Sequence, residues 1–184
     1  MKKRQILILG WVTLLGFSAL GLSLLYFISG IKPAQLFMHG WDPFYQAAAG
    51  LAYGLFAGFV AWRLLKLGFM QKVRNFYGKM LKEMRFNWLD IAFLSLCAGI
   101  GEEILFRGCM QYYAGAIATS IIFVGIHGYL NPKNWRLTIY GIYMTLVILG
   151  LSYIFEEAGM IFAICAHFAI DLFLFGKSEG EEYG

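Results

Sequence analysis

The sequence has little charge and few of the residues from which soluble enzymes build their sites. Only 14% of its 184 residues are charged, it contains three histidines and three cysteines, and 60% of it is hydrophobic. The mean hydropathy is +0.65, which is more apolar than a soluble domain of this size requires for its core. The composition excludes a soluble domain and predicts an all-α integral membrane protein.

Apolar stretches long enough to cross the hydrocarbon core as a helix, about 20 residues each, occur six times. We expect transmembrane helices at 5–28, 44–65, 90–110, 112–130, 137–155 and 159–176. No repeat, low-complexity linker or break in composition divides the chain. Residues 1–184 are therefore predicted to form a single membrane domain, a bundle of about six transmembrane helices plus one interfacial helix.

The three cysteines lie within predicted spans and lack metal-ligand spacing, so we expect small, buried, apolar residues there. Most lysines and arginines fall on one side of the predicted bundle, which predicts a multi-pass protein of the cell membrane with both termini cytoplasmic. The net charge of +4 comes from these loops. It indicates contact with lipid headgroups and argues against a nucleic-acid partner.

Two further patterns concern packing. Gly50, Gly54 and Gly58 form a small-xxx-small row, for which we favour packing within the bundle over dimerisation. Residues 66–87 are predicted to form a cytoplasmic amphipathic helix that lies in the membrane interface. Its apolar stripe consists of Phe69, Val73, Phe76, Met80 and Met84. Its polar face consists of Lys72, Asn75, Lys79 and Lys82.

The stretch "GEEILFRG" places Glu102, Glu103 and Arg107 inside a predicted span. An ionised side chain at mid-bilayer costs about 2.5 to 3.5 kcal/mol. Glu103 and Arg107 share a helix face at i,i+4 and can pair with each other. Glu102 is rotated by about 100 degrees from Glu103, so it is predicted to remain available for another role.

Other ionisable groups follow in two later spans. "FVGIH" places Phe123 and His127 on one helix face, and "HFAID" places His167 and Asp171 four residues apart. A lone histidine in a span can be a structural hydrogen bonder. A set spread over three spans predicts a shared polar cavity, because polar groups at membrane depth face each other or water.

The order "EEILFR", "FVGIH", "HFAID" resembles the EExxxR, FxxxH and HxxxN/D signature of the CAAX protease and bacteriocin-processing family. This family includes the type II CAAX prenyl endopeptidases. The resemblance covers residues 88–176, which would form the motif-bearing catalytic core. It implies an intramembrane endopeptidase that cleaves a prenylated CAAX tail or a bacteriocin-type peptide near the membrane.

The resemblance also implies residue roles. Glu102 and His127 would activate a water molecule, and His167 with its partner Asp171 would stabilise the oxyanion. An ionised aspartate only accepts hydrogen bonds, so we expect Asp171 to orient His167. The structural support would come from Glu103, Arg107 and Phe123.

Three alternatives remain open from the sequence. The first is a catalytic zinc held by Glu102, His127 and His167, although no pair of histidines has the HExxH spacing. We favour catalysis without a metal or other cofactor. The second is a non-catalytic self-immunity or membrane-partner protein, and the third is a proton or ion conduit.

No serine or cysteine stands beside a histidine in a position comparable to that of Glu102, so an acyl-enzyme route is not expected. The sequence does not predict the oligomeric state.

Overall fold

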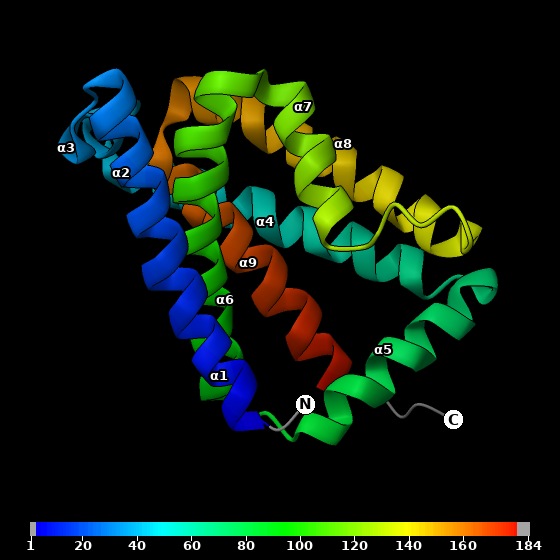
Figure 1. Cartoon of the computed structure of the whole chain (residues 1–184). Coiled ribbons are helices and arrows are strands. Elements are labelled where there is room, and N and C mark those ends of the chain that lie inside the picture. The colour runs from blue at the N-terminus through cyan, green and yellow to red at the C-terminus, as the bar shows by residue number, and fades with distance from the viewer. Residues whose placement is uncertain (1–2, 180–184) are drawn as a thin grey trace.

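The computed structural model describes residues 3–179, and all regular structure in this part of the chain is helical (Figure 1). The helices follow one another with short connections, as expected of a bundle. They are α1 (Lys3–Val12), η1 (Thr13–Phe17), α2 (Ser18–Ser29), α3 (Pro33–Met38), α4 (Pro43–Leu65), η2 (Gly68–Met70), α5 (Gln71–Met84), α6 (Trp88–Glu103), η3 (Ile104–Met110), α7 (Gln111–Ile126), α8 (Trp135–Ala158) and α9 (Met160–Glu179).

Four helical stretches are long and apolar enough to cross a membrane, which confirms the predicted all-α membrane fold. They are Lys3–Ser29, Pro43–Leu65, Trp135–Ala158 and Met160–Lys177. The first is one continuous helix, in which the short π-helical segment η1 joins α1 to α2. These stretches correspond to four of the six predicted spans.

The other two predicted spans, 90–110 and 112–130, differ in form from simple apolar helices. Helix α6 carries the buried glutamate Glu103 and continues into the π-helical segment η3. Helix α7 is kinked at Gly115, where φ is 76° and ψ is 166°, and it ends at Ile126. The part after the kink is about 16 Å long, roughly half of the hydrocarbon thickness. His127 therefore lies at the end of a short helix within the bundle.

The glycine row of α4 packs within the bundle, as predicted, and its partner is α9, which was not predicted. A Cβ atom at Gly50 would lie 2.5 Å from the carbonyl oxygen of Phe162, and one at Gly54 would lie 2.2 Å from that of Ala166. At Gly58 the nearest atom is the Cβ of Phe173, at 3.2 Å. Larger residues at these positions would push the backbones of α4 and α9 apart. The glycine row therefore sets the distance between α4 and the helix that carries His167 and Asp171.

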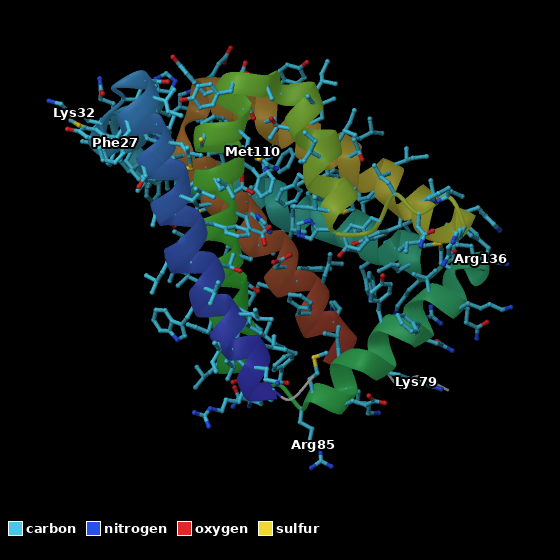
Figure 2. The ribbon with its side chains drawn as sticks, viewed as in Figure 1. Phe27, Lys32, Lys79, Arg85, Met110 and Arg136 are labelled. Carbon is cyan, nitrogen blue, oxygen red and sulfur yellow. The ribbon has the colours of Figure 1, made fainter. Side chains whose placement is uncertain are left out.

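Helix α5 lies along one edge of the bundle. Figure 2 shows Lys79, Arg85 and Arg136 along this edge and Lys32 at the opposite end of the molecule. Val73 faces inward and is buried, whereas Phe76 of the same predicted stripe is 66% exposed. The described part of the chain does not include the side chain of Met80 or the basic residue Lys2. It also includes neither terminus, and we predicted a cytoplasmic location for both termini.

Candidate active site

Three helices bring the ionisable residues of the predicted site together. Glu102 lies at the end of α6, His127 directly follows α7, and His167 and Asp171 lie one turn apart on α9. Two carboxylate-to-histidine contacts join different elements, one from α6 to His127 and one from α6 to α9. Two further carboxylate contacts, with Arg107 and with His167, are i,i+4 pairs along one helix. The three sequence motifs therefore lie close together in the fold, as we expected.

The first contact joins Glu102 to His127. The Oε2 atom of Glu102 lies 3.4 Å from Nε2 of His127, and the two side chains are 15% and 30% exposed. The Nδ1–H of His127 donates a hydrogen bond to the carbonyl oxygen of Phe123 at 2.7 Å. A carbonyl only accepts, so this bond places a proton on Nδ1 and leaves Nε2 facing Glu102. The pair thus consists of a carboxylate and an imidazole that are both partly exposed.

Glu103 makes a different set of contacts, deep inside the protein. Its Oε2 atom lies 3.1 Å from Nε of Arg107, as the i,i+4 spacing predicted. Its Oε1 atom accepts a hydrogen bond from Nδ1–H of His167 at 2.7 Å. The side chains of Glu103 and Arg107 are fully buried. One carboxylate thus links α6, η3 and α9.

Phe123 lies between these two pairs. The guanidinium carbon of Arg107 is 4.5 Å from the centre of the Phe123 ring, a cation–π distance. The same ring is 4.6 Å from the His127 ring and 5.7 Å from the His167 ring, and it packs edge-on against Phe106 at 4.9 Å. Phe123 therefore separates the two histidines and covers the buried guanidinium.

Asp171 lies at the border between the polar cluster and an apolar cavity. Its Oδ2 atom is 3.5 Å from Nε2 of His167, so the imidazole lies between Glu103 and Asp171. Asp171 also lines a cavity of about 130 Å³ between α4, α5, α8 and α9. Tyr129, another lining residue, stacks on His127 with ring centres 6.0 Å apart. The cavity is thus adjacent to both histidines.

Much of the cavity wall was not predicted from the sequence. Tyr77, Tyr129 and Tyr140 line it, together with the basic side chains of Arg74 and Lys177. Tyr129 follows His127 by two residues, which is the one signal that could have suggested a role beside the site. The contact between Glu103 and His167 was also missed, because the pairing of side chains on different helices cannot be inferred from helical spacing.

The three candidate zinc ligands do not converge on one point. His167 directs Nδ1 at Glu103 and Nε2 at Asp171, whereas Glu102 contacts His127. Within residues 3–179, no group of three or more histidine, cysteine, aspartate or glutamate side chains is arranged to hold a metal ion. This geometry does not fit a resident zinc ion.

Comparison with known proteins identifies the part of the chain that carries the site. Residues 84–173 match the sequence profile described as type II CAAX prenyl endopeptidase Rce1-like. The matched segment is just under half of the chain, and it resembles the Rce1-like family. The Rce1-like region contains all four candidate catalytic residues, so the predicted resemblance is confirmed.

A curated relative overlaps with part of the chain. The uncharacterized protein YpbD of Bacillus subtilis (strain 168) is 37% identical over 82 residues. This alignment covers 44% of the present chain and 41% of YpbD, so the chain matches less than half of its relative. No solved structure matches the chain.

Proposed function

We propose that the protein is an intramembrane endopeptidase in which Glu102 and His127 activate a water molecule. The observation that carries this proposal is their contact, with Nδ1–H of His127 bound to the Phe123 carbonyl and Nε2 directed at the carboxylate. Both side chains are partly exposed, and the proposed reaction places the water on this exposed side. A base within reach of a water is the first requirement of direct hydrolysis.

In the proposed reaction, a water held by Glu102 and His127 adds through its oxygen to the carbonyl carbon of the scissile peptide. Glu102 accepts the proton that the water loses. The oxyanion that forms accepts a hydrogen bond from Nε2–H of His167, which is 3.5 Å from Asp171, while Nδ1–H stays bound to Glu103. Collapse of the tetrahedral intermediate breaks the C–N bond, and the proton passes from Glu102 to the leaving amine. The products are a carboxylate and an amine.

The cavity beside the two histidines supports an amphiphilic substrate. Its walls are mainly apolar and aromatic, and Arg74 and Lys177 lie among them. An apolar side chain or lipid group of the substrate would fill the cavity, and the two cations suit a nearby carboxylate. A prenylated CAAX tail or a bacteriocin-type peptide meets both requirements.

We favour a reaction without a metal, because both nitrogens of His167 face carboxylates that orient it. The check is prolonged dialysis of the purified protein against a chelator, followed by measurement of peptide cleavage. Cleavage should persist. Loss of cleavage that added zinc restores would overturn the metal-free reaction.

The proposed function is tested by Glu102→Gln in lipid nanodiscs, with Glu157→Gln as the matched control. Glu157 is an exposed glutamate at the end of α8 and makes none of the ion-pair contacts of the site. With a quenched farnesylated CAAX-type peptide as probe, Glu102→Gln should lower the cleavage rate by about 100-fold or more. The control should cleave like the unaltered protein, and both variants should insert and fold.

A complementary experiment tests other substrates. Cells that carry Glu102→Gln in place of the native protein should accumulate an uncut membrane peptide, identifiable by mass spectrometry. Equal peptide profiles in both strains, together with retained self-immunity, would favour the non-catalytic account. Proton flux through protein-containing liposomes that disappears in the variant would favour the conduit.

A further inference from the structure

A second hollow adjoins the cavity beside the histidines and shares part of its lining. It has a volume of about 540 Å³ and is formed by α5 and the segment 131–137. Three basic residues line it, Lys72, Lys133 and Arg136, together with the amides of Asn131 and Asn134. We call it the basic groove. It contains none of the motif residues, so the proposed hydrolysis does not account for it.

The positive charge of the basic groove is not neutralised by any residue between 3 and 179. Among the described residues, neither lysine nor Arg136 forms an ion pair. The Nε atom of Arg136 is buried and has no hydrogen-bond partner in the described part of the chain. A buried donor without a partner is costly. An acceptor from outside the protein would satisfy it.

The surroundings of the groove indicate which ligand supplies that acceptor. Phe76, which lines the groove, is 66% exposed, and Trp135 is 53% exposed and stacks on Phe69 with ring centres 5.6 Å apart. Exposed aromatic rings beside lysine and arginine are typical of the membrane–water interface. Arg136 lies on the same edge of the molecule as Lys79 and Arg85 (Figure 2).

We propose that the basic groove binds the phosphate headgroup of an anionic phospholipid. The phosphate oxygens accept hydrogen bonds from Lys72, Lys133 and Arg136, and the acyl chains lie along the exposed Phe76 and Trp135. An acidic soluble partner would not require these aromatic rings. The lipid is therefore the occupant that accounts for both the charge and the apolar rim.

The groove also shares a wall with the cavity beside the histidines. Val73, Tyr77 and Leu137 line both hollows. A headgroup that bridges α5 and the segment 131–137 holds these three side chains in place from the outer side. Anionic lipid therefore stabilises the shape of the proposed substrate cavity. This second effect rests on the proposed function, whereas the binding itself does not.

The binding test compares two double variants in phosphatidylcholine nanodiscs titrated with phosphatidylglycerol. Lys72→Ala with Lys133→Ala removes two cations from the groove, and Lys79→Ala with Lys82→Ala removes two exposed cations that do not line it. The groove variant should bind phosphatidylglycerol about 30-fold more weakly, as measured by native mass spectrometry. The control should change by less than about two-fold.

Equal losses in both double variants would overturn the proposal, because general surface charge would then explain the binding. It would also be overturned if the groove variant kept its affinity for phosphatidylglycerol but lost affinity for a polyglutamate peptide. Hydrogen exchange of α5 gives a second readout, and phosphatidylglycerol should slow it only where both groove lysines are present. Binding without peptide cleavage in any lipid would contradict the proposed function and leave the lipid site supported.

Discussion

Glu102 and Glu103 are adjacent in the sequence but lie in different environments. The side chain of Glu103 is fully buried and contacts Arg107 and His167, whereas that of Glu102 is 15% exposed and contacts His127. A rotation of about 100 degrees along the helix produces this difference. One motif can thus supply both a structural carboxylate and a chemically available one.

The largest effect on stability should come from Glu103→Gln. This change leaves Arg107 without an anionic partner in the interior and weakens the bond to His167. Removal of one partner from a buried ion pair costs about 3 to 5 kcal/mol. The free energy of unfolding, measured by denaturing-detergent titration of refolded protein in mixed micelles, should fall by this amount.

Glu102→Gln is the matched control for that measurement. Its partner His127 keeps the bond to Phe123 and is partly exposed, so the stability should change by less than about 1 kcal/mol. Similar stability losses in the two variants would show that the two carboxylates contribute equally to stability. The difference between a structural Glu103 and an available Glu102 would then be contradicted.

The contrast between the two glutamates could be predicted only in part from the sequence. Spacing along one helix predicts the Glu103–Arg107 pair and places Glu102 on another face. It cannot predict that His167 approaches Glu103 from α9, because this depends on how closely α9 packs against its neighbours. The close packing of α9 rests on Gly50 and Gly54, whose row was predicted but whose partner helix was not.

The fold shows the same division between local and long-range information. Apolar length predicts the spans that consist of uniform helices. It does not predict the kink at Gly115 or the π-helical segment η3, because the apolar length of a segment carries no information about its local backbone geometry. The cavity is still harder to predict, since its walls come from several helices and from the segment after His127.

A smaller effect is expected from Phe123→Leu, which acts on both carboxylate pairs at once. The change removes the ring that covers Arg107 and contacts both imidazoles. Loss of these aromatic and cation–π contacts should lower the stability by about 1 to 3 kcal/mol. Peptide cleavage should also fall, because His127 and His167 lose the surface that separates them.

The control for Phe123 is Phe56→Leu, because Phe56 is 71% exposed on α4. It should leave both the unfolding free energy and the cleavage rate unchanged within error. If Phe123→Leu lowered stability without affecting cleavage, Phe123 would support only the buried pair, and the two carboxylate pairs would be independent.

The smallest effect is expected from Asp171→Asn, which tests whether Glu103 alone suffices to orient His167. The bond to Glu103 is 2.7 Å long and the contact with Asp171 is 3.5 Å, so Glu103 holds the ring more firmly. The amide oxygen of asparagine can accept a hydrogen bond at the same position. Cleavage should therefore fall by less than about ten-fold, with the stability within about 0.5 kcal/mol. Asp171→Ala should reduce cleavage further, since it removes the acceptor altogether. Equal loss of cleavage in both variants would show that the negative charge of Asp171, rather than its acceptor oxygen, positions His167.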